Sequence, residues 1–142
     1  MRLDKMTSQL QAALSEAQSA AIGLDHTQIE PEHLLAALLS ASGSSVRPMA
    51  AKAGFNLAEL KQGLDQRIQG FASVTSPTGE IQLSPALGKL LNLAEREQQQ
   101  WKDAYLSGEV VFLAALGDKG GLGDFLRKQG SVEAFRKVMT EL

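Results

Sequence analysis

A helix pattern that occurs twice, 77 residues apart, limits the folds open to this chain more than any other feature. The stretches "IEPEHLLAALL" at 29–39 and "LSGEVVFLAAL" at 106–116 each place a glutamate, Glu32 or Glu109, ahead of an apolar run. The same shift aligns identical residues over 7–39: Leu10/Leu87, Leu14/Leu91, Ala17/Ala94, Glu32/Glu109, Ala37/Ala114 and Leu39/Leu116. Past residue 40 the shift falls to 76 and then to 75. Because helix caps, apolar stripes and stops recur in the same order, the sequence predicts a tandem duplication of a four-helix unit.

The first repeat, about residues 7–69, carries a start or stop signal for each helix. Thr7 can cap a helix whose stripe of Leu and Ala residues continues to Leu24. Pro31 suits the first position of a second helix, where no N–H is needed. A third helix is predicted to stop at Gly54, a left-handed terminator, and Asn56 to cap a fourth.

A linker of about residues 70–83, rich in Gly, Pro, Ser and Thr, separates the repeats and leaves room only for a short extended "EIQL". The second repeat, about residues 84–142, begins at Ser84 before a proline. Its first helix has an apolar stripe from Leu87 to Trp101, and Ser107 precedes its second helix. Gly130 is predicted to stop the third helix as Gly54 does in the first repeat, and Ser131 to cap the fourth.

Composition agrees with an all-α fold, since Ala, Leu, Gln, Glu and Lys are plentiful and aromatic residues are only 5%. A length of 142 residues suits one domain. The net charge of −2 without a basic run argues against nucleic-acid or membrane partners. Without cysteines, a signal-peptide pattern or an apolar run of membrane length, the expected location is cytoplasmic.

The repeated unit, with "IEPEHLLAALL" as its signature, resembles the Clp amino-terminal repeat domain of the Clp AAA+ chaperones. The start "MRLDKMTSQLQAALSEAQSAA" and the "IEP" before "EHLL" look most like the ClpB disaggregase branch. The resemblance covers 1–142 and implies eight helices in two pseudo-symmetric four-helix repeats packed as one globular domain. In the family this domain precedes two ATPase modules and a middle domain, so ATP and Mg²⁺ would belong to those modules and not to this stretch.

The resemblance also implies a polar contact site for substrate. Family residues linked to that role fall on Thr7, Asp103 and Glu109, each matching in type, and a groove position that is commonly Leu is Val110 here. Each polar residue has a structural alternative: Thr7 as a helix cap, Asp103 as a solvated loop acid, and Glu109 as a first-turn carboxylate that complements the helix dipole.

Two leucines of the helix after Ser84 are further candidates for apolar substrate contacts. Leu93 lies about 100° from the centre of the apolar stripe, and Leu91 lies toward its edge. A leucine at the edge of a stripe is more often part of the core, so both readings stay open for Leu91 and Leu93.

The sequence does not support catalysis. The run "GDKGGLGDF" lacks the Gly-Lys-Ser/Thr of a phosphate loop and predicts a flexible interhelical loop. His26 and His33 lack the spacing of an HExxH metal site, so core packing is expected for them. We therefore expect a non-enzymatic domain with no cofactor or metal of its own.

The resemblance implies the substrate-engaging domain of an ATP-dependent disaggregase, which binds unfolded or aggregated polypeptides before the AAA+ modules thread them, in cooperation with a DnaK-type chaperone system. The isolated domain is expected to be a monomer and the full-length protein a homohexamer. Two alternatives remain: a domain that docks folded adaptors, and a free-standing Clp-repeat protein that regulates another assembly.

Overall fold

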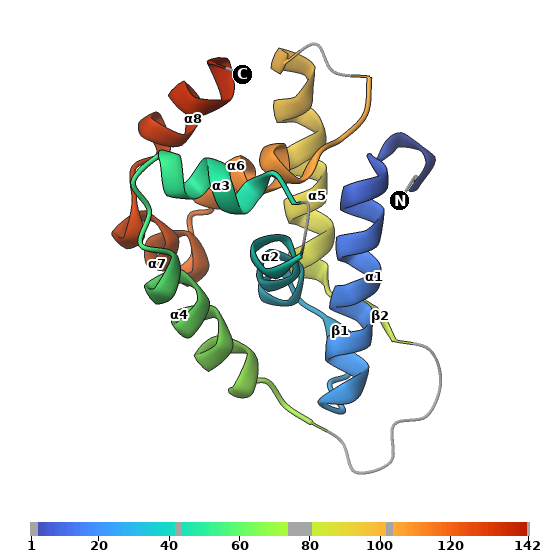
Figure 1. The fold of residues 1–142 in the computed structure, drawn as a ribbon. Helices are drawn as coiled ribbons and strands as arrows, with labels where there is room; N and C mark the ends of the chain where they lie inside the picture. The colour runs from blue at the N-terminus through green and yellow to red at the C-terminus, as the bar shows by residue number, and fades with distance from the viewer. Residues whose placement is uncertain (1–2, 42–43, 74–80, 102–103, 142) are drawn as a thin grey trace.

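The computed structural model describes residues 3–41, 44–73, 81–101 and 104–141, and these contain eight α-helices (Figure 1). The first four are α1 (Ser8–Gly23), α2 (Pro31–Ser40), α3 (Val46–Lys52) and α4 (Leu57–Gln69). The second four are α5 (Pro85–Gln98), α6 (Gly108–Leu116), α7 (Gly121–Gln129) and α8 (Val132–Thr140). Short 3-10 turns η1 (Leu3–Lys5) and η2 (Gln99–Trp101) and strands β1 (Gln28–Ile29) and β2 (Gln82–Leu83) complete the described elements. The predicted all-α class is confirmed.

Four predicted helix caps are formed. Each accepts, through a side-chain oxygen, a hydrogen bond of 3.0–3.2 Å from the N–H three residues further on: Thr7, Asn56, Ser84 and Ser131. Ser107 also precedes its helix, α6, but makes no side-chain cap bond, and its buried Oγ has no partner among the described residues.

Two short backbone pairings reveal the symmetry of the repeats. Strand β1 pairs in parallel with β2, which places Ile29 opposite Leu83. Met6, before α1, forms a parallel bridge with Leu106, before α6. A shift of 77 residues turns Met6 into Leu83 and Ile29 into Leu106, so each pairing is the copy of the other. The two repeats are therefore related by a pseudo-twofold axis that exchanges these pairings.

The N–H groups of the caps follow the same symmetry. Thr7 N–H donates to Leu106 O at 2.9 Å, and Ser84 N–H donates to Ile29 O at 3.0 Å. Each repeat thus ties the start of its first helix to the segment before the second helix of the other repeat.

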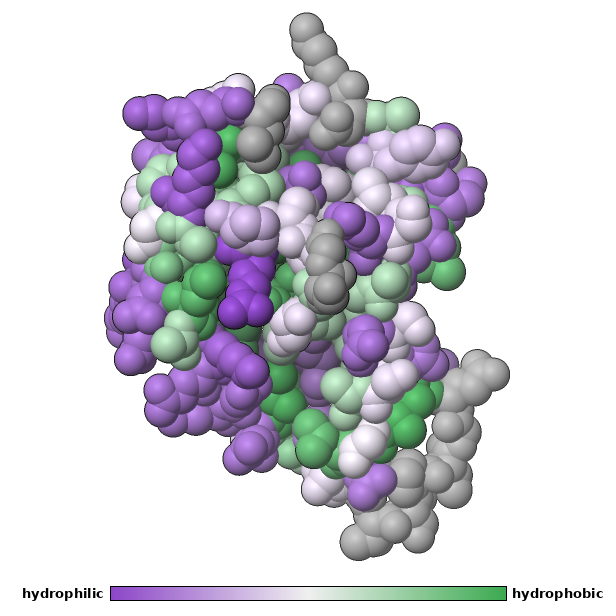
Figure 2. Space-filling model, viewed as in Figure 1, coloured by the Kyte–Doolittle hydropathy of each residue, from purple (hydrophilic) through white to green (hydrophobic). Residues whose placement is uncertain are grey.

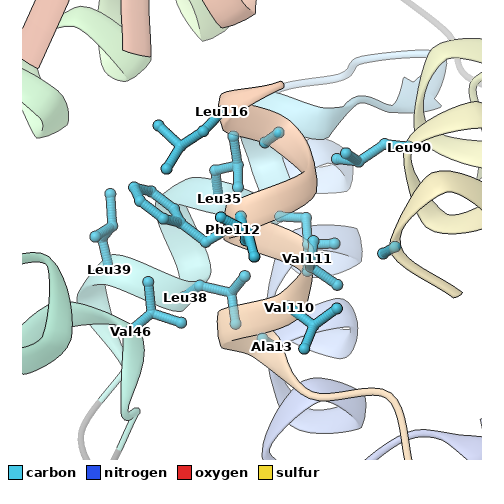
Figure 3. Packing of buried hydrophobic residues seen from close by; sticks show 14 of the residues in the cluster. Ala13, Leu35, Leu38, Leu39, Val46, Leu90, Val110, Val111, Phe112 and Leu116 are labelled. Carbon is cyan, nitrogen blue, oxygen red and sulfur yellow. The ribbon is translucent and has the colours of Figure 1, made fainter. Parts of the chain in front are cut away.

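One hydrophobic core spans both repeats. Its centre is α6, which buries residues all round its axis (Figure 3). Phe55, between α3 and α4, packs against Phe112 of α6 and Phe135 of α8, with ring centroids 5.7 and 6.1 Å away. Because Phe55 belongs to the first repeat and its two partners to the second, the repeats share this cluster rather than having separate cores.

Gly54 and Gly130, the glycines predicted to end helices, are required for different structural reasons. Gly54 has φ of 90°, the left-handed conformation predicted for it. Gly130 does not match it, because its φ of 178° is extended backbone. An ideal Cβ at Gly130 would lie 2.5 Å from the Phe55 ring, so this position needs glycine for space. Both glycines follow the ends of their helices as predicted, but only Gly54 does so in the left-handed conformation.

The apolar stripe of α1 is shorter than the sequence suggested. Leu10, Ala13, Ala17 and Ala21 are buried, and Leu14 is half-buried. Leu24 was expected to extend the stripe, but it is 46% exposed. The helix ends at Gly23, and the chain then turns through the positive φ of Asp25, so Leu24 leaves the buried face.

Candidate functional site: a groove between the repeats

The polar residues suggested by the resemblance lie at neighbouring helix starts. Thr7 caps α1 and Glu109 lies in the first turn of α6; both are half-buried. The hydrogen bond from Thr7 N–H to Leu106 O brings these two starts side by side. Asp103 lies outside the described residues.

Of the three apolar candidates, only Leu93 reaches the surface, with 37% of its area exposed. Leu91 and Val110 are both fully buried. Leu91 of α5 belongs to the shared core. Val110 is one of the buried residues of α6 (Figure 3). Their side chains therefore support the fold beneath the surface, and neither is available to a ligand in this conformation.

Leu93 lines a groove of about 310 Å³ at the junction of the two repeats, which we call the interrepeat groove. The start of α2, the end of α4, one face of α5 and the segment from α6 to α7 form its walls. Its apolar lining residues are Pro31, Phe71, Ala86, Leu90, Leu93, Ala115 and Leu122, and its charged ones are Glu30, Glu32, Arg67, Lys89 and Asp118. Neither Thr7 nor Glu109 is among these lining residues.

The pseudo-twofold axis relates the groove to a second place, at the start of α6, that is filled. There Leu38 and Val46 pack closely over Gly108. An ideal Cβ on Gly108 would lie 2.7 Å from Leu38 Cδ2 and 3.3 Å from Val46 Cγ2, which is tighter than normal contact. Among the described residues, no space is left for a side chain directly above Gly108.

In the groove, the three equivalent positions hold different residues. Pro31 stands in place of Gly108, Ala115 in place of Leu38, and Leu122 in place of Val46. Replacing a leucine by an alanine removes three methyl-sized groups from the centre of the contact. Ala115 is fully buried and lines the groove, where it fills less volume than Leu38 fills in the counterpart.

The equivalent glutamates of the groove and of its filled counterpart have different hydrogen-bond partners. In the filled counterpart, Ser45 Oγ donates to Glu109 Oε1 at 2.9 Å. In the groove, the equivalent Glu32 is only 6% exposed and accepts from Arg67 Nε at 3.0 Å. The residue equivalent to Ser45 is Gly121, and an ideal Cβ there would lie 3.6 Å from Arg67 Nη2. The Arg67 guanidinium therefore lies within contact distance of the start of α7.

Of the other charged residues around the groove, the two acids make hydrogen bonds and the lysine makes none with the described residues. Asp118 Oδ2 accepts from two backbone N–H groups at the start of α7, both at 3.1 Å. Glu30 forms a capping box with His33 at the start of α2. Lys89 is exposed on α5 and makes no ion pair or hydrogen bond with any described residue.

A buried histidine pair lies next to the groove, behind Phe71. His26 Nδ1 and His33 Nε2 are 2.9 Å apart, and Glu30 N–H donates to His33 Nδ1 at 2.8 Å. The Phe71 ring packs against both imidazoles. Burial, with a smaller contribution from His26, lowers the pKa of His33 from 6.5 to about 4. The expected core packing of both histidines is confirmed. In the part of the chain described, no three His, Asp or Glu side chains gather as a metal site.

The chain matches the family described as the Clp repeat (R) N-terminal domain over residues 5–129. It belongs to this family. ClpB chaperones are similar over the whole domain: the Pseudomonas putida protein is 45% identical over 100% of this chain, and the Vibrio cholerae protein 44% over 94%. This Clp N-domain spans only 17% and 16% of the length of those two relatives.

Solved structures of other Clp N-domains share its fold. The Hsp104 N-terminal domain from Candida albicans superposes with a TM-score of 0.82 at 22% identity, covering 96% of this chain and 90% of that one. A ClpV N-domain in complex with a VipB peptide gives 0.78 at 25% identity, covering 96% and 86%. The described helices of this Clp N-domain include none long and apolar enough to cross a membrane.

Sequence reasoning found Leu93 but missed Arg67, Lys89, Phe71 and Leu122. A signal was present for the groove itself, because the 77-residue alignment already sets Ala115 against Leu38. No comparable signal pointed to Arg67, whose partner Glu32 is 35 residues away in sequence.

Proposed function

We propose that this Clp N-domain engages non-native polypeptide, and that the interrepeat groove is where it does so. The observation that carries the proposal is the groove itself: an apolar hollow with an exposed leucine, opened in one repeat and filled in the other. Exposed concave apolar surface is uncommon in a stable domain unless it binds something. The ClpB relatives and the peptide bound to a ClpV N-domain support a polypeptide ligand.

The binding mechanism would be shallow and apolar. An aliphatic side chain from an extended segment would enter between Leu90, Leu93 and Leu122, and transfer of that side chain from water would supply most of the affinity. A hollow of about 310 Å³ admits one or two side chains, so a single domain binds weakly. In a hexamer several such domains would hold one substrate together and raise the overall affinity.

The larger assembly forms part of the same proposal. The domain would precede AAA+ modules that bind ATP and Mg²⁺ and thread the captured segment, together with a DnaK-type chaperone system in the cytoplasm. The polar pair Thr7 and Glu109, with Asp103, would then contact parts of the same polypeptide outside the groove.

A pair of exposed leucines provides the test. Leu93→Ser removes the apolar rim of the groove, and Leu24→Ser makes the same change at an exposed leucine elsewhere. Binding of fluorescent, reduced and alkylated α-lactalbumin is measured by anisotropy for both variants. Leu93→Ser should weaken binding about fivefold, as expected for the loss of about 1 kcal/mol of apolar contact. Equal binding by the two variants would remove the groove from the proposal.

A second candidate function is the docking of a folded adaptor, favoured by the likeness to ClpV N-domains. A folded partner would cover the groove together with its surroundings, whereas an unfolded segment would occupy the groove alone. Competition separates the two: alkylated α-lactalbumin should be displaced by short aliphatic peptides if the groove binds unfolded segments. Failure of such peptides to compete would favour adaptor docking or a free-standing regulatory protein.

A further inference from the structure

Two cations line the interrepeat groove, Arg67 and Lys89, and both keep unused hydrogen-bond donors. Arg67 uses Nε to bind Glu32, while Nη1 and Nη2 make no hydrogen bond or ion pair with the described residues. Lys89 offers three further donors and is also without a partner in the part of the chain described. Three acids also line the groove, and each is engaged: Glu32 by Arg67, Asp118 by two backbone N–H groups, and Glu30 in the capping box of α2.

The free donors lie beside the apolar wall. Lys89 and Leu93 are four residues apart on α5, so they are neighbours on the same face of the helix. The Arg67 guanidinium is held at Nε by Glu32, lies beside Gly121 and lines the groove. A planar guanidinium fixed in this way presents two parallel N–H donors, which suit the two oxygens of a carboxylate.

We propose that the groove selects extended segments in which an aliphatic side chain lies next to an Asp or Glu side chain. This inference rests on the proposed function and specifies its substrate class. The aliphatic group occupies the hollow between Leu90 and Leu93, and the carboxylate binds Arg67 and Lys89. Side-chain carboxylates, rather than chain ends, are the source, because internal segments far outnumber termini in non-native polypeptide.

The test uses the 142-residue protein and three acetylated, amidated heptapeptides. One alternates leucine with glutamate, the second leucine with glutamine, and the third leucine with lysine. Dissociation constants are measured by NMR titration at low and high salt. The glutamate peptide should bind about fivefold more tightly than the glutamine peptide at low salt, and this advantage should shrink at high salt. The lysine peptide should bind most weakly of the three.

Two lysine variants locate the preference. Lys89→Glu should reverse the preference from the glutamate to the lysine peptide, whereas Lys61→Glu, an equal change at an exposed lysine of α4 outside the groove, should leave it unchanged. Arg67→Lys keeps a positive charge near Glu32 but loses the planar fork, so it should reduce the advantage of the glutamate peptide. Thermal melts of each variant check that it is folded.

The outcomes separate the two proposals. Equal binding of the glutamate and glutamine peptides, with shifts at the groove, would overturn the acidic preference and leave the groove as an apolar site. A fourth heptapeptide, the leucine–glutamine sequence with a free carboxyl end, tests the source of the carboxylate: binding of this peptide more tightly than the amidated glutamate peptide would overturn the choice of side-chain carboxylates. No binding of any peptide or of alkylated α-lactalbumin would overturn the proposed function itself.

Discussion

The Ser45 hydroxyl donates a hydrogen bond to Glu109 Oε1 at 2.9 Å and joins the segment before α3 to the first turn of α6. Glu109 is half-buried and its carboxylate retains further acceptor sites, so one neutral hydroxyl satisfies it only in part. In the other repeat the equivalent Glu32 is nearly fully buried and bound to a guanidinium. The two glutamates at this repeat position therefore differ in burial and in the charge of their partner.

Replacement of each glutamate by glutamine should reveal this difference. Glu32→Gln leaves Arg67 without its counter-charge inside the groove and should lower the free energy of unfolding by about 2 kcal/mol, reduced from the fully buried case because Arg67 is partly solvated. Glu109→Gln keeps an acceptor for Ser45 and should cost less than about 1 kcal/mol. Urea unfolding of both variants measures the difference, and equal costs would show that the Arg67 pair adds nothing to stability.

Filling the groove from within should abolish binding without harming the fold. Ala115→Leu places in the second repeat the side chain that Leu38 already provides in the first. Because Ala115 is fully buried, the cost in stability should be about 1–3 kcal/mol, while affinity for alkylated α-lactalbumin should fall at least tenfold.

The reverse change is the control for that experiment. Leu38→Ala removes a buried side chain from the filled counterpart and should cost about 2–5 kcal/mol, since a cavity remains. If Ala115→Leu left binding intact, the ligand would have to be held outside the interrepeat groove.

His33 should make stability depend on pH in the acid range. Because the pKa of His33 is lowered to about 4 in the folded state, the unfolded chain takes up its proton first as pH falls below 6.5. The contribution of neutral His33 is complete above pH 6.5 and is lost progressively down to pH 4. Its full size is at most about 3 kcal/mol. Urea unfolding at pH 7, 6 and 5 measures this loss.

A matched variant assigns the acid sensitivity to His33. His33→Gln can still accept from Glu30 N–H and donate to His26, but it does not titrate. The variant should lose less stability than the parent chain between pH 7 and 5. An unchanged pH profile in His33→Gln would mean that other groups cause the sensitivity.

Neither repeat should fold alone. The cluster of Phe55, Phe112 and Phe135 draws on both, and a unit of about 70 residues with only its own short helices has too small a core. Residues 1–75 expressed separately should show no cooperative thermal transition by circular dichroism. A sharp melt resembling that of the whole chain would contradict the shared core.

Local signals allowed most of the fold to be predicted. Thr7, Asn56, Ser84 and Ser131 cap helices because their side chains satisfy N–H groups three residues away, a requirement that can be read directly from the sequence. The need for glycine at position 130 was harder to predict, because it arises from contact with the Phe55 ring, which is distant in the sequence.

The candidate site was predicted only in part. The exposure of Leu93 follows from its angle on a helix, which is a local property. The angle of Leu91 left both readings open, because its burial depends on the helices that pack around it. The Glu32–Arg67 pair depends on how α4 packs against α2, and no spacing rule reports such a contact. Charge placement in the groove is therefore a property of tertiary packing.

The exchange of backbone pairings between the repeats has a consequence for synthesis on the ribosome. Thr7 N–H finds its partner at Leu106, almost a hundred residues later in the chain. At ordinary rates of translation this interval is on the order of 10 s. Throughout it α1 can pack against α2, but Phe55 still lacks its partners Phe112 and Phe135, so the nascent chain presents to the cell the kind of apolar segment that a chaperone recognises.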